Sequence, residues 1–265
     1  MKDLSMAIEI GVGQFHISPD DARLAVLGYA FGTREVRPSP KAFSGAFEQE
    51  LAPRWGYCTH DCIARSDDTE FTDLDVLVAA GLNGRLGVDS VAALKLATGR
   101  AAGSVAAAAK IVAVAARAAN DGVRLSFADL ASNELAGDPP EGSIGALLAQ
   151  AWRQMMSTPG VGVALTHKVL HHKQPEIFPL LDNLTIEKLS GRPTRRSAWQ
   201  QIHLELAASR EEFESLRSWF AEQAADRGGV AVSLTRLYDI LLWLKAKGVN
   251  EWEAALEAGS RLRPL

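Results

Sequence analysis

Helical periodicity dominates the chain after about residue 70. Apolar residues recur at spacings of three and four over 73–82, 89–97 and 105–119, and the last segment is so rich in alanine that we expect close packing around it. Further helices are predicted at about 127–134, 144–156, 163–172, 183–190, 195–208, 210–226 and 232–247. Glycine and proline supply the breaks between these segments. The pattern is typical of an all-α protein.

Residues 1–70 carry a much less regular pattern. Ala7 to Ile10 could form a short strand and Pro19 to Tyr29 a helix, but 31–66 mixes glycine, proline and charge without a period. Neither a recurring strand pattern nor a repeat of 20–50 residues follows. We therefore expect two parts: an irregular N-terminal section, 1–70, packed on a helical domain, 71–265. Two helical lobes with a cleft between them would suit this length.

The composition is that of an ordinary globular protein. Of 265 residues, 47% are hydrophobic and 23% charged, and no apolar run approaches the ~20 residues that cross a membrane. The opening Met-Lys-Asp-Leu-Ser-Met stretch lacks the apolar centre of a signal peptide, and two cysteines make no disulfide framework. We expect a cytoplasmic monomer with no membrane partner.

The most informative stretch is the turn between the helices predicted at 144–156 and 163–172. Pro159 stops the first helix, and two glycines allow a tight turn that Val161 plugs into the core. The second helix then begins with free backbone N–H groups at Gly162, Val163 and Ala164, which form an anion site suited to a DNA phosphate. A plain helical hairpin with no partner is the alternative interpretation.

Basic residues crowd the helix after this turn, although the net charge of the chain is -4. A local basic patch can bind DNA despite an acidic total. We expect His167 and Lys168 to contact phosphates; a solvated face is the alternative. The sequence thus predicts a DNA-binding hairpin over 144–173.

Asp182 follows at a spacing of eighteen residues from Ala164 and opens the helix predicted at 183–190. With Pro159-Gly160-Val161-Gly162 it resembles the motif of the helix-hairpin-helix DNA glycosylase superfamily, which includes endonuclease III and 8-oxoguanine glycosylases. The likeness spans about 158–186. The chain also resembles an uncharacterised bacterial helical family that shares the hairpin. The marks of that family here are Lys173-x-Pro175, Pro179-x-x-Asp182 and the Ser233-Leu234-x-Arg236-Leu237-x-Asp239 helix ending at Trp243.

The resemblance implies that Asp182 is the catalytic carboxylate, beside a deoxyribose on which positive charge develops. It places the DNA contacts at Gly160, Val161, Gly162, Val163, Ala164, His167 and Lys168. It also implies an alkali cation on the carbonyl oxygens of Met156, Thr158 and Val161; we expect no other cofactor. As an alternative, Asp182 is a helix N-cap, and both roles can coexist.

Two departures from the glycosylase pattern narrow the chemistry. Bifunctional members have a lysine where this chain has Ala164, so we expect no Schiff base and no strand cleavage by β-elimination. Lys168, one turn later, is the only candidate to replace it. Members with an iron–sulfur cluster use four cysteines, and this chain has two.

Other candidate residues carry weaker signals. Trp55 and Tyr57 could stack on an extruded base, although core packing is the alternative. Cys58, His60 and Cys62 offer metal ligands, but such close neighbours rarely form a tetrahedron, so we expect no metal site.

The sequence therefore predicts a monofunctional glycosylase that removes a damaged or modified base from double-stranded DNA. The bulky modified bases of phage genomes are a possible target, which would mean antiviral defence. Two rival interpretations are a non-catalytic helix-hairpin-helix DNA-binding module and an all-α protein-interaction domain without salt-sensitive DNA affinity.

Overall fold

The structure is a computed structural model that describes residues 7–36, 50–64, 70–82, 88–118, 125–135, 138–190 and 195–262. Its helices are α1 (Pro19–Phe31), α2 (Asp73–Val78), α3 (Val88–Ala118), α4 (Ile144–Met156), α5 (Val163–Lys173), α6 (Asn183–Ser190), α7 (Arg195–Ala208), α8 (Arg210–Asp226), α9 (Leu234–Lys247) and α10 (Val249–Leu262). Two antiparallel hairpins, β1 (Ile8–Ile10) with β2 (Phe15–Ile17) and β3 (Thr33–Val36) with β4 (Glu50–Pro53), precede most of them. The all-α prediction is confirmed for the body of the protein.

Short helical turns complete the described chain. They are the π-helical turn η1 (Tyr57–Asp61) and the 3-10 turns η2 (Ala79–Leu82), η3 (Phe127–Asp129) and η4 (Ser132–Glu134). The helix predicted at 127–134 is thus two separate 3-10 turns. The segments predicted at 89–97 and 105–119 are one helix, α3, because Gly99 and Gly103 do not interrupt it.

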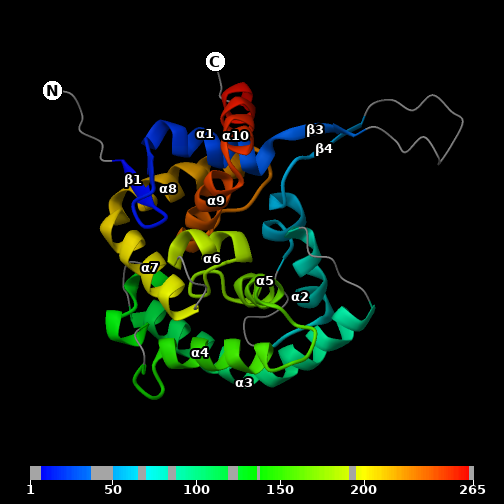
Figure 1. The fold of residues 1–265 in the computed structure, drawn as a ribbon, viewed down its shortest axis with the longest axis vertical. Coiled ribbons are helices and arrows are strands. Elements are labelled where there is room, and N and C mark those ends of the chain that lie inside the picture. The colour runs from blue at the N-terminus through cyan, green and yellow to red at the C-terminus, as the bar shows by residue number, and fades with distance from the viewer. Residues whose placement is uncertain are drawn as a thin grey trace, which may run out of the picture.

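Helix α5 lies in the middle of the molecule, with α3 and α4 along one edge and α1 and α10 at the opposite one (Figure 1). Its neighbours are α4, α2 and η2. Eight consecutive residues of α5, 166–173, are buried although five of them are histidine or lysine. The low amphipathicity of this helix therefore reflects burial on all sides, as expected for a central element.

The described parts of the N-terminal section form more regular secondary structure than their sequence indicates. Helix α1 begins at the N-cap Ser18 and packs against α8, α9 and α10. The turn between β1 and β2 donates the Gly11 and Val12 N–H groups to the carboxylate of Glu205 on α7, at 2.8 and 2.6 Å. The tight turn is thereby anchored to the helical body.

In the described part of the chain, no helix combines the length and the apolar character needed to cross a membrane.

Candidate active site

The hairpin turn has the geometry that its sequence predicts. Gly160 has φ +84, a conformation that residues with a side chain rarely adopt, and Val161 is buried in the core. Gly162 is the N-cap of α5, and the first backbone bond of the helix runs from Thr166 N to Gly162 O at 3.0 Å. The N–H groups before Thr166 therefore have no partner within the helix, which leaves a site for an anion.

A side chain from α3 braces the turn. The guanidinium of Arg100 donates to Thr158 Oγ1 at 3.2 Å, and Thr158 O accepts the Val161 N–H at 3.2 Å. Gly160 and Gly162 are exposed, while Val163 and Ala164 are half-buried. The predicted contacts at Gly160 and Gly162 thus lie at the surface, whereas Val161 is buried and its N–H is bonded within the turn. The cation predicted at the carbonyls of this turn stays a prediction.

His167 does not lie at that surface, and the prediction that it contacts phosphate is wrong. Its side chain is fully buried. Nδ1 bonds to Pro179 O at 2.9 Å, and Nε2 accepts the indole N–H of Trp152 at 3.2 Å. The imidazole links the loop that follows α5 to α4, because one ring nitrogen can donate a hydrogen bond while the other accepts one.

Lys168 is also buried, with 7% of its surface exposed. The prediction that it contacts a phosphate is therefore wrong. Its ammonium donates to Leu82 O at 2.6 Å. Burial lowers the pKa of Lys168, and the negative charge of Asp182 acts in the opposite direction. The lysine points inward and lines the same pocket as Asp182.

Asp182 is half-buried and caps helix α6. Its Oδ1 accepts the Thr185 N–H at 2.9 Å, and Thr185 Oγ1 accepts the Asp182 N–H at the same distance. The N-cap interpretation is therefore confirmed. This cap fixes the position of the carboxylate at the wall of a pocket.

That pocket lies where the N-terminal section meets α5 and α9. It is lined by Tyr29, Trp55, Gly56, Leu82, Lys168, Leu180, Asp182, Arg236, Asp239 and Trp243. The free volume is about 40 Å³, little more than one water molecule occupies in the liquid. A nucleotide could enter only if side chains moved, and Trp243, half-buried, is the least enclosed of the aromatic residues there.

Of the two aromatic residues singled out in the sequence, only Trp55 reaches this pocket. It stacks on Tyr29 with the ring centroids 5.8 Å apart. Tyr57 is fully buried, packs against Phe31 and Phe220, and bonds through its hydroxyl to the backbone of Val230. The prediction that Tyr57 stacks on a base is therefore wrong, because this ring belongs to the core.

A buried cluster of charge forms the floor of the pocket. Arg236 donates two hydrogen bonds to Asp61, at 2.9 and 2.8 Å, and a third to Asp239 Oδ2. Burial opposes the charge of Arg236, but Asp61, Tyr29 and Asp239 outweigh it and raise its pKa. Burial acts to raise the pKa of Asp61, yet Arg236 outweighs it and lowers that pKa.

The sequence did not lead us to assign this cluster to the site, although the spacing of its residues on α9 could have indicated it. Arg236, Asp239 and Trp243 are spaced three and four residues apart on an apolar helix. That spacing puts them on one face of α9. Charged residues on the buried face of a helix indicate an ion pair or a site.

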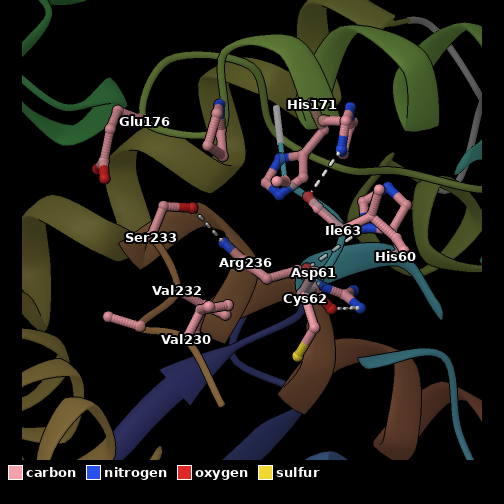
Figure 2. Close-up of a pocket in the computed structure, with 14 residues that line it drawn as sticks. His60, Asp61, Cys62, Ile63, His171, Glu176, Val230, Val232, Ser233 and Arg236 are labelled. Atoms are coloured by element: carbon pink, nitrogen blue, oxygen red, sulfur yellow. Dashed lines mark hydrogen bonds and ion pairs between the residues drawn. The ribbon is translucent and has the colours of Figure 1, made fainter. Parts of the chain in front are cut away.

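A second, larger cavity of about 250 Å³ adjoins Arg236 from η1, the end of α5 and the loop before α9. In Figure 2, Glu176 and Ser233 lie on one side of it and His60 and His171 on the other. Neither Asp182 nor Lys168 lines this cavity. Burial lowers the pKa of both His60 and His171, so these imidazoles are neutral over a wide pH range.

Metal-ligating side chains do not converge in the described part of the chain: no group of three histidine, cysteine or acidic residues is placed to hold an ion. Cys58 and Cys62 are free thiols, and His60 is directed to Asp61 Oδ1 at 3.3 Å and Lys168 O at 3.4 Å.

Comparison with curated proteins and with solved structures found no significant match. A family model does match, over residues 45–246, which include the turn, the charged cluster and every residue that lines the pocket except Tyr29. The chain therefore belongs to DUF6308, a family of unknown function.

Proposed function

We propose that this protein is a DNA glycosylase of the helix-hairpin-helix type, with two helical lobes, that hydrolyses the N-glycosidic bond of a damaged or modified base. The observation that carries the proposal is that Asp182 and Lys168 line one pocket, beside the helix that the Pro-Gly-Val-Gly turn begins. Lys168 lies six residues beyond Gly162, or about 9 Å along α5. The anion site and the pocket are therefore close enough to serve one strand.

Each part of the site has a step in this reaction. The turn grips a phosphate through backbone N–H groups, which positions the duplex without selecting a sequence. The target nucleotide rotates out of the stack, at a cost of about a few kcal/mol, and displaces side chains at the pocket. Asp182 then stabilises the positive charge on the sugar and directs a water molecule to it.

The test is release of a base from double-stranded DNA. The substrates are duplexes that carry uracil, hypoxanthine, 8-oxoguanine or the bulky modified pyrimidines of phage DNA, each treated with hot alkali after incubation. We expect strand breaks only after alkali, and an Asp182→Asn variant that is inactive while keeping its fold. Salt-sensitive binding to DNA without breaks on every substrate would favour a non-catalytic DNA-binding module instead. No salt-sensitive binding at all would favour the protein-interaction domain.

The position of Lys168 supports a second candidate, excision combined with strand cleavage. Burial lowers the pKa of this amine, and a neutral amine can attack C1′ of the sugar to form a Schiff base. Borohydride reduction traps that intermediate as a covalent protein–DNA adduct. An adduct with the wild type that is absent with Lys168→Met would establish the lyase activity; base release without an adduct would establish a monofunctional enzyme.

A further inference from the structure

Asp182 shares the pocket with a second carboxylate, that of Asp239 on α9. Only 3% of Asp239 is exposed. Its Oδ2 accepts a hydrogen bond from Arg236, whereas its Oδ1 is buried with no hydrogen-bond partner in the described part of the chain. An ionised carboxylate with its oxygen in that position costs more than a protonated one, because burial then removes the solvation of a charge as well as a hydrogen bond.

The charges around Asp239 also favour a bound proton. The groups that face it are Arg236 on its own helix, Asp61 on η1, Asp182 before α6, Lys168 on α5 and Tyr29 on α1. With Asp239 itself, the cluster therefore holds three carboxylates and two cations. Burial lowers the pKa of one of these cations, Lys168.

Arg236 cannot neutralise both of its carboxylate partners. Asp61 takes two of its hydrogen bonds, so Asp239 is the surplus acid of the cluster. Burial, and then the charge of Asp182, raise the pKa of Asp239 to about 7, although Arg236 acts to lower it. A buried carboxylic acid with its unpartnered oxygen beside a reactive carboxylate is the arrangement in which one acid donates a proton and the other stays ionised.

We propose that Asp239 donates a proton to the departing base, while Asp182 acts on the sugar; this rests on the glycosylase function proposed above. As the bond between C1′ and the base nitrogen breaks, its electron pair passes to the base and the base takes the proton from Asp239 Oδ1. Water adds to C1′ and transfers a proton to Asp182. The products are the neutral base and the abasic sugar, and a proton passes through solvent from Asp182 to Asp239.

The geometry gives each atom of Asp239 a separate task. Oδ2 stays on Arg236, which holds the side chain in place, and Oδ1 is the atom with no other bond to break. Asp239 lines the 40 Å³ pocket, so the proposal requires that the movement admitting a nucleotide also uncovers Oδ1.

The experiment is the pH dependence of single-turnover excision by the wild type and by Asp239→Asn, with the substrate on which the wild type is active. We expect the wild-type rate to fall as pH rises through neutrality. The variant should be about 10²–10⁴-fold slower at low pH and lack that fall, so that the ratio of the two rates shrinks at high pH. Asp89→Asn, which alters an exposed aspartate on α3, is the matched control and should keep the wild-type profile.

A second measurement needs no variant. The wild type is compared on its substrate and on an analogue of the same base with an electron-withdrawing substituent, which leaves more readily as an anion. We expect the analogue to lose less rate as pH rises. A ratio of wild-type to variant rates that is independent of pH, or equal pH dependence for the two bases, would overturn the proton donor and leave the glycosylase standing. Absence of excision by the wild type on every substrate would overturn both.

Discussion

Basic residues of α5 form buried contacts within the protein, although their clustering in the sequence favours a DNA-binding face. His171 bonds through Nδ1 to Phe178 O at 2.6 Å, and Lys173, completely buried, pairs with Asp75 at 3.2 Å. Such groups are kept inside only by partners, because a buried charge without one is very unfavourable. The partner of Lys173 lies 98 residues away in the sequence, so a local pattern could not identify it.

The contribution of the ion pair between Lys173 and Asp75 to the stability of the fold can be measured. Asp75→Asn removes the counterion of a buried ammonium and weakens the bond to His172 at 3.1 Å. We expect the free energy of unfolding to fall by about 3–5 kcal/mol in urea denaturation. Asp73→Asn, in the same helix, breaks an exposed pair with Lys95 and should cost at most about 1 kcal/mol. Similar losses for the two variants would contradict this account.

The lowered pKa of Asp75 should make the protein less stable in acid. Its neighbours, His172 first, lower its pKa to about 2 despite burial. Because the folded-state pKa is lowered, the stabilisation is present above the ordinary carboxyl pKa of 3.8 and is lost as pH falls toward 2. Urea midpoints measured across this range should decline for the wild type and decline less for Asp75→Asn. An equal decline would contradict the prediction.

Asp239 predicts a pH dependence of the opposite sign. Burial raises its pKa to about 7, so the folded state binds this proton more tightly than the unfolded chain does. Its stabilisation is therefore present below pH 3.8 and is lost as pH rises through 7. Thermal unfolding between about pH 5 and 8 should show the wild type losing stability and Asp239→Asn losing less. A variant with the same decline as the wild type would disprove the assignment.

At the scale of elements, the hairpin is the part that local sequence specifies best. Helix α4 ends at Met156 and α6 spans Asn183–Ser190, as predicted, and α5 extends one residue beyond its predicted end, to Lys173. Glycine at φ +84 and a capping aspartate act within a few residues of themselves, so their signal is visible in the sequence. The two merged segments of α3 show the converse: packing against α4 overrides two helix-weakening glycines.

The anion site at the start of α5 can be tested without disturbing the hairpin. A side chain added at Gly162 meets nothing within 4 Å, and the N-cap has extended backbone angles. Asparagine and aspartate are both favoured there, so neither Gly162→Asn nor Gly162→Asp should lower the melting temperature. Only aspartate adds negative charge where a phosphate would bind, and we expect it to weaken DNA binding by about tenfold or more, relative to asparagine. Equal affinities of the two variants would argue against DNA at this turn.

At the scale of the whole molecule, the first and the last helix of the described chain pack together. Helix α1 packs against α10, and glycines allow the approach: a Cβ at Gly28 would lie 1.9 Å from Ala255 O, and one at Gly259 would lie 2.0 Å from Leu24 O. Sequence analysis did not predict α10. The N-terminal section is therefore part of the core and contributes Tyr29 and Trp55 to the pocket.

This close approach predicts opposite outcomes for two similar substitutions. Gly28→Ala should destabilise the protein by about 2 kcal/mol or more, because backbone atoms cannot move aside as side chains do. Gly103→Ala, in the exposed part of α3 where nothing lies within 4 Å, should raise stability by about 0.5–1 kcal/mol. Chemical denaturation compares the two. A mild effect at Gly28 would mean that α1 and α10 are not in contact.

The sequence alone determined the helical body, the Pro-Gly-Val-Gly turn and the N-cap at Asp182, since each depends on neighbours a few positions away. Only the tertiary structure decided which polar residues are interior. It buried His167 and Tyr57, placed Lys168 and Asp182 at one pocket, and brought Arg236 and Asp239 from α9 to the same pocket. The physical reason is that burial and charge pairing depend on what lies opposite a side chain in space, and such partners can be far away in the sequence, as for Arg236 and Asp61, which are 175 residues apart.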